Sequence, residues 1–508
     1  MNNTVLTEET NLKIHTMENH DNAYHVWKES GVKQRILVHI DAHHDMWFIR
    51  EGHYINIANY ICRAIEDKIV SEIFWVVPDK TWDSKKNIKP ILQYLSKITK
   101  TYPGKAVPIN IQLDYISTSV YGKSLTVCTL NNLPSLNKYV LLDIDVDYLV
   151  IPQVAPYGKS DTYVGLPWCW PNELIKKLDS QNIKTDLITI AYSVEGGYTP
   201  LKWKYLGDEV LVRLKNEDTA SIKGMELIKS ASILAHENNF HEAEKLYLEA
   251  KKLLVASPVP DYHLSLLYAK NDKLHKAQKH YKQALLKDPS YKTPYNSFAI
   301  NYYEDKYLNE AKEEHLKVLN LDPDDPYALI GLAQIALKRK EWKEGEYLVG
   351  KALEINQEIP DVYRILGDLL LKQNKIEEAI NAYESCLKLL LHGYKSINSL
   401  ILSATKNSPL TNYDHYYVHS KLAYLRSLKG DITQAINGYK ICTTGGSCGF
   451  FIYSRLAYLY LKKKKYKEYF REMLEAIKVI PLDLRDYFSD LIISISANFT
   501  KPKINLYS

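Results

Sequence analysis

The chain has 508 residues, of which 46% are hydrophobic and 25% are charged. This composition is typical of a globular protein and excludes a disordered chain. The 65 Lys and Arg residues against 60 Asp and Glu residues leave a net charge of +5, which is too small to indicate a nucleic-acid or membrane-surface partner. At about 100–200 residues per domain, the length predicts two or three domains.

The amino terminus and the cysteines indicate the cellular compartment in which the protein is expected. The first residues lack the basic and apolar regions of a secretory signal, and no stretch approaches the roughly 18 apolar residues that a membrane span needs. The six cysteines form no CxxC pair, so neither a zinc knuckle nor a disulfide framework is indicated. We therefore expect a soluble, cytoplasmic protein with reduced, structural cysteines.

Short β-branched runs alternate with helical stretches over residues 1–215. The expected strands span 35–40, 72–77, 107–113, 139–144 and 186–192, and the expected helices span 22–30, 56–67, 88–100 and 171–181. Nearly continuous apolar strands that alternate with helices predict an α/β domain with a mainly parallel sheet covered on both faces. Ligands of such sheets bind beyond the carboxyl ends of the strands.

Two runs of alternating acidic residues and histidines follow strands of this predicted sheet. They are Asp41, His43 and Asp45 after the first strand, and Asp143, Asp145 and Asp147 at the end of the fourth. The side chains of alternate residues in an extended backbone point to the same face. Several carboxylates buried together at the end of a strand need a cation to offset their charge. Oxygen and imidazole ligands without thiolates favour manganese over a structural zinc. The two motifs offer more ligand atoms than one ion binds, so we expect two ions, roughly 3.5–4 Å apart, that share carboxylates.

These motifs resemble those of the arginase/agmatinase (ureohydrolase) family. Asp41-Ala-His43-His44-Asp45 is similar to the Asp-Ala-His-x-Asp motif of that family, and Asp143-Ile-Asp145 is similar to its later Asp-x-Asp motif. The resemblance implies a three-layer α/β/α fold, two manganese ions and hydrolysis of a guanidino group. It also implies two ligand sets, which are His20, Asp41, Asp45 and Asp143 for one ion, and Asp41, His43, Asp143 and Asp145 for the other.

The chain departs from the family pattern in two places. The family has a Gly-rich segment around its first histidine, which is absent near His20, and this chain has Leu141, Tyr148 and Leu149 where the family has Ser and Asp-Pro. The register of the second motif therefore stays open. Asp145 and Asp147 form the alternative metal pair, and Asp147 is otherwise expected to orient a ligand.

The remaining pattern of the first 210 residues resembles a divergent branch of the family. The segments "INIANYI", "LLDIDVDY" and "AYSVEGGYTP" carry this resemblance, and the branch includes peptide arginases that convert arginine to ornithine in ribosomally made peptides. The resemblance implies that Glu195 binds the guanidinium group, as a planar cation needs a bidentate anion. His53, His44 and His39 are candidates to protonate the leaving amine. Of these, His53 at a loop-to-helix junction is preferred, because His44 alternates away from the metal face and His39 fits a hydrogen-bonded strand histidine.

Small residues recur every 34 residues in the second half of the chain. One series comprises Ala243, Ala277, Ala311, Gly345 and Ala379, and a second comprises Ala250, Ala284, Val318, Ala352 and Cys386. Small residues suit close helix crossings, and Asp-Pro at 288–289 and 322–323 ends a helix. The pattern resembles the tetratricopeptide repeat. We expect an all-α solenoid over residues 221–488, irregular at 391–412 where the period slips by 22 residues, and a tail over 489–508.

The fusion of the two parts indicates a peptide substrate. Stacked repeats present a concave surface that in this family commonly holds a peptide or a partner protein, and an anchored peptide reaches the metal site at a raised effective concentration. The expected substrate is an arginine-containing precursor peptide docked on the repeats. The alternatives are free arginine, agmatine or another guanidino compound, a single-metal deacetylase, or a non-catalytic repeat scaffold with a degenerate metal domain. Repeat arrays also self-associate, so a homo-oligomer is a further expectation.

Overall fold

The computed structural model describes most of the chain. The described residues are 12–47, 55–100, 107–156, 161, 165–194, 198–215, 219–292, 308–394, 413–444 and 450–476. Their contacts divide the described chain into two compact units, of which the first comprises the described residues up to 357 and the second comprises those from 358 onward.

The first unit contains an eight-stranded mixed sheet. Its strands are β1 (Lys13–Met17), β2 (Arg35–Ile40), β3 (Val70–Val76), β4 (Asn110–Ile111), β5 (Tyr115–Val120), β6 (Lys123–Cys128), β7 (Val140–Asp145) and β8 (Thr185–Ala191). They lie in the order β1-β8-β7-β2-β3-β6-β5-β4. All pairs from β1 to β6 in this order are parallel, and β5 is antiparallel to both β6 and β4. The expectation of a mainly parallel sheet is confirmed.

The central strands are apolar because helices cover both sides of them. Every residue of β7 is buried, whereas both residues of the edge strand β4 are exposed. The pattern of the sequence missed β1 and the β5–β6 hairpin, and the expected strand at 107–113 contains only β4. The hairpin turns at Tyr121 and Gly122, both with positive φ, which is the geometry of a two-residue hairpin turn.

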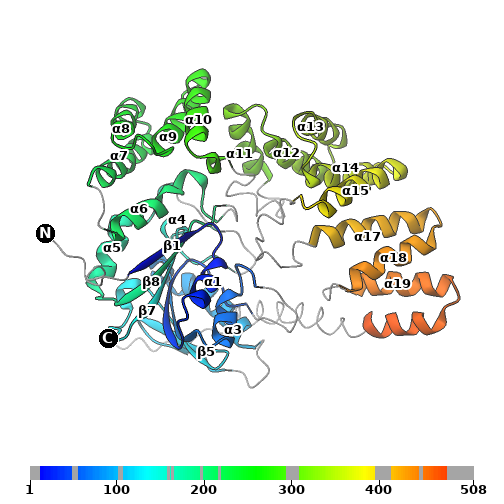
Figure 1. Ribbon diagram of the computed structural model, residues 1–508, viewed down its shortest axis with the longest axis horizontal. Coiled ribbons are helices and arrows are strands. Elements are labelled where there is room, and N and C mark those ends of the chain that lie inside the picture. The colour runs from blue at the N-terminus through cyan, green and yellow to red at the C-terminus, as the bar shows by residue number, and fades with distance from the viewer. Residues whose placement is uncertain are drawn as a thin grey trace. The chain divides into compact units, whose positions relative to one another are not determined.

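Helices form a layer on each face of the sheet. They are α1 (Asn22–Glu29), α2 (Tyr60–Glu66), α3 (Lys85–Lys100), α4 (Asp147–Val150), α5 (Pro171–Ser180) and α6 (Tyr205–Leu214). Short 3-10 helices occur at Asp79–Trp82, Leu130–Asn132, Leu201–Trp203 and Pro289–Tyr291. Side chains of α1, α2 and α3 share one core with the sheet, and those of α5 and α6 share another. The two helix layers lie on opposite sides of the sheet in Figure 1.

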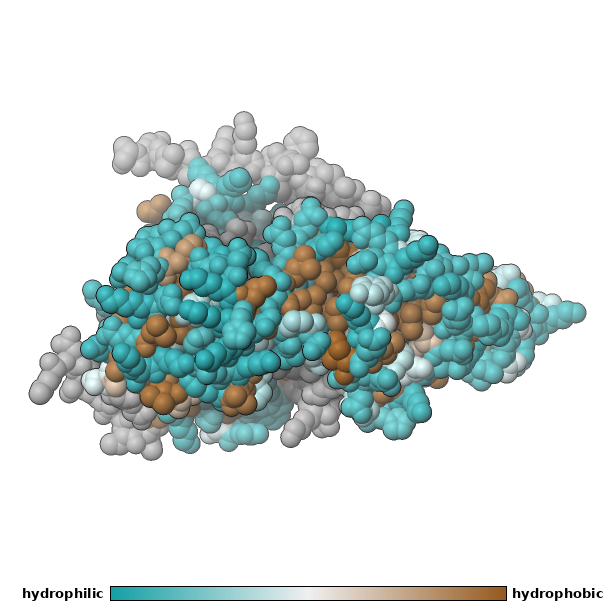
Figure 2. Space-filling view, turned by 90° about the horizontal axis from the view of Figure 1, so that it is seen from above, coloured by the Kyte–Doolittle hydropathy of each residue, from teal (hydrophilic) through white to brown (hydrophobic). Residues whose placement is uncertain are grey.

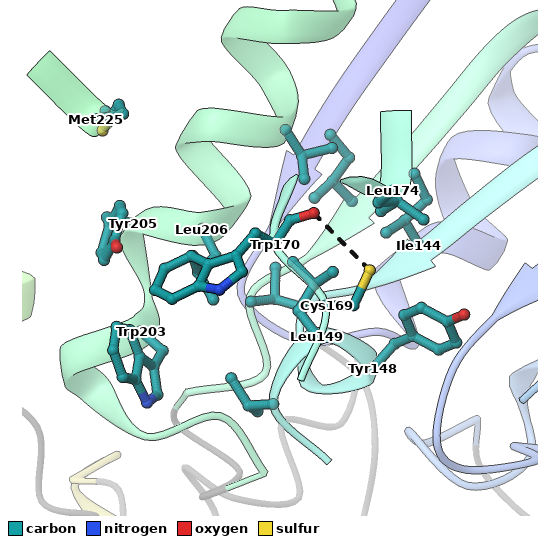
Figure 3. Packing of buried hydrophobic residues seen from close by; sticks show 14 of the residues in the cluster. Ile144, Tyr148, Leu149, Cys169, Trp170, Leu174, Trp203, Tyr205, Leu206 and Met225 are labelled. Atoms are coloured by element: carbon teal, nitrogen blue, oxygen red, sulfur yellow. Dashed lines mark hydrogen bonds between the residues drawn. The ribbon is translucent and has the colours of Figure 1, made fainter. Parts of the chain in front are cut away.

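The second of these cores continues from the sheet into the first repeat helices. The ring of Trp170 stands perpendicular to that of Trp203 with centroids 5.8 Å apart, and Met225 of the first repeat helix belongs to the same cluster (Figure 3). The buried Cys169 thiol lies 3.8 Å from the Trp170 carbonyl oxygen. Trp170 therefore packs in the core. The five cysteines among the described residues are all buried.

Paired helices make up the rest of the described chain. In the first unit they are α7 (Thr219–His236), α8 (Phe240–Leu253), α9 (Val259–Lys270), α10 (Leu274–Lys287), α11 (Leu308–Leu321), α12 (Pro326–Arg339) and α13 (Trp342–Ile355). In the second unit they are α14 (Pro360–Lys372), α15 (Ile376–Leu391), α17 (Tyr413–Leu428), α18 (Ile432–Thr444) and α19 (Phe450–Lys462). Hairpin neighbours pack against each other, as in α7 with α8, α9 with α10 and α14 with α15.

The 34-residue series falls on the second helix of each hairpin. Ala243, Ala277 and Ala379 are fully buried there, so the small side chains mark helix contacts as expected. Helices α10 and α11 end directly before Asp288 and Asp322, where Asp-Pro was expected to end them.

The length and hydrophobicity of the helices bear on whether any of them could cross a membrane. Among the described residues, none of the helices is long and apolar enough to span a bilayer. Hydrophilic residues cover most of the face shown in Figure 2, and hydrophobic residues form separate patches between them.

Candidate metal centre

The acidic residues and histidines of the two motifs come together at the carboxyl edge of the sheet. Asp41 directly follows β2, Asp143 and Asp145 end β7, and His20 lies three residues beyond β1. Parallel strands bring these ends to one edge. Asp45 has φ of 50°, so the chain turns there and the loop after β2 stays over the same edge.

His20 lies at the centre of the carboxylates. Its Nδ1 is 3.1 Å from Asp41 Oδ2, 3.4 Å from Asp45 Oδ2 and 3.0 Å from Asp145 Oδ2. Its Nε2 is 2.9 Å from Asp143 Oδ2. The residue is 2% exposed, and neither ring nitrogen makes a hydrogen bond of acceptable geometry within the described chain. Ring nitrogens and carboxylates thus converge without pairing as donors and acceptors.

His43 is a second histidine that contacts several carboxylates. Its Nδ1 is 2.8 Å from Asp147 Oδ2 and 3.5 Å from Asp41 Oδ1. Its Nε2 is 3.2 Å from Asp161 Oδ2. The backbone N–H of His43 donates to Asp41 Oδ1 at 2.6 Å. Asp161 was not among the sequence candidates, because it stands alone in a loop and belongs to no motif.

A row of polar side chains crosses three strands beneath these contacts. His39, Asp143 and Thr189 are paired in register on β2, β7 and β8. Asp143 lies 2.9 Å from His39 Nδ1 and accepts hydrogen bonds from Thr189 Oγ1 at 2.5 Å and from Tyr60 at 2.9 Å. His39 is thus a hydrogen-bonded strand histidine, as expected, and its Nε2 also lies 3.3 Å from Asp41 Oδ2.

Asp145 and Asp147 are held by the ends of neighbouring segments. Ser193 Oγ donates to Asp145 Oδ2 at 2.6 Å, and the backbone N–H of Asp147 donates to Asp145 Oδ1 at 2.9 Å. The N–H of Ala42 lies 3.4 Å from Asp147 Oδ1. Asp145 Oδ2 also lies 3.0 Å from His20 Nδ1, and Asp147 Oδ2 lies 2.8 Å from His43 Nδ1, so both carboxylates contact the histidines of the cluster.

Burial and the neighbouring charged groups shift the pKa values of these acids in opposite directions. Burial and the neighbouring Asp41 raise the pKa of Asp45 to about 6. Burial and Asp145 raise the pKa of Asp147 well above its usual range. Burial also acts to raise the pKa of Asp41, but His39 and His20 outweigh it and hold that pKa below its usual range. Buried carboxylates at this density need positive charge to remain ionised together.

The donor set fits divalent cations. Four groups of three side chains bring one potential ligand atom each to within 4.8 Å of one another. These groups are His20, His39 and Asp143; His20, Asp41 and Asp145; His39, Asp41 and Asp45; and Asp41, His43 and Asp147. Buried imidazole and carboxylate donors with unpaired atoms suit a hard or borderline ion such as Mn²⁺. Asp41 belongs to three of the four groups, as expected of a shared ligand.

The predicted catalytic residues are only partly placed. His53 and Glu195 lie outside the described residues. His44 does not join the carboxylates: its Nδ1 accepts a 2.9 Å hydrogen bond from the N–H of Met46, and burial lowers the pKa of His44 to about 3. A neutral imidazole of this kind is a poor proton donor at neutral pH.

A cavity of about 140 Å³ opens onto the cluster. His20, His43 and Asp45 line it together with Trp47 and Tyr94. It therefore joins the charged groups to an aromatic wall, and it is small beside the roughly 300–1,000 Å³ of typical ligand pockets.

Comparison with known proteins identifies the repeats. The family model for the tetratricopeptide repeat matches residues 360–389, which form the hairpin of α14 and α15. The paired helices of the described chain form a helical region like that of tetratricopeptide repeats. A TPR repeat-containing protein of Methanocaldococcus jannaschii is 22% identical over 356 residues, a match that covers 62% of this chain and 60% of that relative's length.

Solved structures with repeats are also similar to parts of this chain. MamA is 18% identical, with a TM-score of 0.29, and the match covers 36% of this chain and 96% of MamA. YrrB, described as a TPR protein with an unusual peptide-binding site, is 14% identical with a TM-score of 0.26, and the match covers 50% of this chain and 98% of YrrB. The family model confirms, over residues 360–389, the tetratricopeptide repeat expected from the 34-residue period.

Proposed function

We propose that the sheet domain is a manganese-dependent hydrolase of the arginase type that converts arginine side chains of a peptide to ornithine and urea. The observation that carries this proposal is the convergence of His20 with four carboxylates, three of them at 3.1 Å or less, at the carboxyl edge of a mainly parallel sheet. The motif resemblance supplies the guanidino substrate and assigns Glu195 to bind it.

The contacts favour one register of the second motif over the other. His43 lies closest to Asp147, and His20 contacts Asp145. Asp143 also lies 2.9 Å from His20, but it is more heavily hydrogen-bonded than Asp145, because its Oδ2 faces both His39 and Tyr60 while its Oδ1 accepts from Thr189. In our proposal, therefore, Asp145 and Asp147 are the metal pair, Asp41 is shared, and Asp143 supports the site from below.

The proposed reaction has a simple balance. The oxygen of a water molecule forms a bond to the guanidinium carbon of arginine, and the bond from that carbon to Nε breaks. Urea leaves, and the side-chain nitrogen takes up the protons of the water to become the ammonium group of ornithine. Two divalent ions held by the cluster would lower the pKa of such a water towards neutrality. The crowded carboxylates of the chain favour a cationic group in the cavity.

The repeats supply the argument for a peptide. A solenoid offers an extended surface on which one segment of a peptide can be anchored while another segment enters the metal site. Tethering of this kind raises the local concentration of the arginine without any new contact at the site. Free arginine gains nothing from such a surface.

Mass spectrometry after incubation with Mn²⁺ and arginine-containing peptides tests the proposal. We expect arginine to lose the elements of cyanamide and urea to appear. Asp145→Ala should abolish both signals. Asp67→Asn is the control and should keep them, because Asp67 precedes the amino end of β3, away from the carboxyl edge of the sheet, and accepts a hydrogen bond from Tyr24. Robust turnover of free arginine with none in any peptide would contradict the peptide substrate.

A repeat scaffold without catalysis is the second candidate, and the comparisons favour it. The matched family model and the relative from Methanocaldococcus jannaschii are both named for the repeats. A scaffold needs no bound metal, so a chain that binds its partners equally well with and without Mn²⁺, and that releases no urea, would establish this candidate.

A further inference from the structure

Part of the wall of the cavity over the cluster is aromatic. His44, Trp47, Trp75 and Tyr94, here called the aromatic end, line the cavity together with the carboxylates. The ring centroids of Trp47 and Tyr94 lie 4.9 and 5.0 Å from that of His44, and that of Trp75 lies at 5.9 Å. These rings form one packed group that belongs to the same cavity as the proposed metal ligands.

Two hydrogen bonds fix the aromatic end relative to the cluster. Trp75 is fully buried, and its Nε1–H donates at 3.1 Å to the carbonyl oxygen of Asp41. The N–H of Met46 donates at 2.9 Å to His44 Nδ1. Both anchors are backbone groups of the loop that carries Asp41 and His43, so the rings and the ligands are held by the same segment.

The hydrogen bond from Met46 decides what His44 can offer. A ring nitrogen that accepts a hydrogen bond carries no hydrogen, so the hydrogen of the neutral imidazole lies on Nε2. The aromatic end therefore includes the neutral Nε2–H donor of His44 beside the indole of Trp47 and the phenol of Tyr94. Of the described residues that line the cavity, none is Lys or Arg.

This chemistry distinguishes a peptide from a free amino acid. Free arginine carries an α-carboxylate, and burying this negative charge against aromatic rings without a partner is unfavourable. A peptide group has no net charge, its flat face stacks on aromatic rings, and its carbonyl oxygen accepts one hydrogen bond.

We infer that the aromatic end is a subsite for the peptide group next to the arginine, with His44 Nε2–H donating to its carbonyl oxygen. The inference rests on the proposed function for the location of the side chain at the cluster. It gives His44 a role in binding in place of the proton transfer considered from the sequence. Trp47 and Tyr94, both half-buried, form the uncharged rim that the backbone of the peptide meets.

Lysine derivatives separate this subsite from the hydrolytic reaction, because lysine is cationic but has no guanidino carbon to attack. Calorimetric titration of the full chain with Mn²⁺ would compare Nα-acetyl-lysine N-methylamide with free lysine. We expect the blocked compound to bind at least about tenfold more tightly, a factor that corresponds to about 1.4 kcal/mol. Equal binding, or tighter binding of free lysine, would overturn the subsite even if the chain releases urea from arginine.

Variants of His44 test the donor itself. His44→Phe keeps a buried ring but removes the N–H, so the preference for the blocked compound should fall several-fold while binding of free lysine stays unchanged. His44→Gln, which can still donate, should retain part of the preference and serves where the Phe variant does not fold. Equal losses for both lysine compounds in both variants would overturn the assignment. A preserved preference in a chain that never releases urea would instead refute the proposed function alone.

Discussion

Thr189 on β8 donates a 2.5 Å hydrogen bond to Oδ1 of Asp143 on β7, at a position where the two residues are paired in register. The Thr189 oxygen in turn lies 3.3 Å from Nε1 of Trp27, which donates to it from α1. All three side chains are fully buried. The core of the sheet domain and the floor of the candidate metal centre are therefore joined by one chain of hydrogen bonds.

Replacing Thr189 by valine tests this chain of bonds. Thr189→Val keeps the shape of the side chain but leaves Asp143 Oδ1 without its donor and Trp27 without its acceptor. We expect a loss of about 1–3 kcal/mol in the free energy of unfolding, since each buried partner is left unsatisfied. Urea-induced unfolding measures the loss, and Thr189→Ser is the matched control because it keeps the hydroxyl. A valine variant as stable as the serine variant would contradict the role of this bond.

Asp161 offers a test of how His43 is oriented. Its Oδ2 lies 3.2 Å from His43 Nε2, while His43 Nδ1 faces Asp147. A carboxylate on the outer nitrogen of a metal-binding histidine commonly raises metal affinity 10–100-fold. Asp161→Ala should therefore weaken binding of one of the two Mn²⁺ ions by about that factor and leave the other nearly unchanged, as measured by calorimetry. Equal weakening of both ions, or no weakening, would show that Asp161 does not orient His43.

These two contacts also show how far the sequence could predict the site. The alternation of Asp41, His43 and Asp45 after an apolar strand is a local pattern, and the structure brings these residues together with Asp143 and Asp145. Thr189 and Asp161 carry no such signal, because they contact residues 46 and 118 positions away. Contacts of that kind depend on strand order and register, which local patterns do not encode.

For the fold too, local sequence patterns predicted some elements and missed others. Apolar runs such as Val140–Asp145 were recognised because parallel strands buried on both faces are nearly continuous in hydrophobicity. The β5–β6 hairpin was missed because Ser and Thr interrupt the apolar residues of both strands and the strands lie near the sheet edge. The repeats were recognised from their period, which the matched family model confirms over residues 360–389.

A buried carboxylate in the repeats should contribute strongly to stability. Asp261 is fully buried and lies 2.6 Å from Lys251 Nζ, 2.9 Å from Lys287 Nζ and 2.8 Å from His280 Nδ1. These groups outweigh burial and hold the pKa of Asp261 below its usual range. Asp261→Asn removes one partner of a buried charge network and should cost about 3 kcal/mol.

Thermal unfolding measures the effect of this substitution. The matched control is Asp272→Asn at an exposed position of the same repeat, where we expect less than about 0.5 kcal/mol. Similar melting temperatures for the two variants would rule out a special role for the Asp261 network.

Burial of His263 predicts an acid-sensitive first unit. Its Nε2 lies 3.0 Å from the Lys202 carbonyl oxygen, and burial lowers the pKa of His263 to about 3. In the unfolded chain the pKa is about 6.5, so below that pH the unfolded state binds the proton and the folded state does not. The stabilisation is complete above about pH 6.5 and is lost as the pH falls towards 3, by up to about 1.4 kcal/mol per pH unit.

Substitution of His263 isolates this contribution. In His263→Phe the free energy of unfolding should depend less steeply on pH between 6 and 4 than in the unaltered chain, whatever the effect on stability at pH 7. Denaturant unfolding at several pH values gives the two slopes. Parallel slopes would mean that His263 titrates alike in the folded and unfolded chain.

Calorimetric titration of the purified chain with Mn²⁺ tests the central claim most directly. The account predicts two bound ions per chain, because the cluster offers more carboxylate and imidazole ligands than one ion needs. Asp41→Ala should weaken the binding of both ions, since Asp41 contacts His20, His39 and His43. No saturable binding of Mn²⁺ or a similar divalent ion, or binding that Asp41→Ala leaves unchanged, would contradict a metal centre at this edge of the sheet.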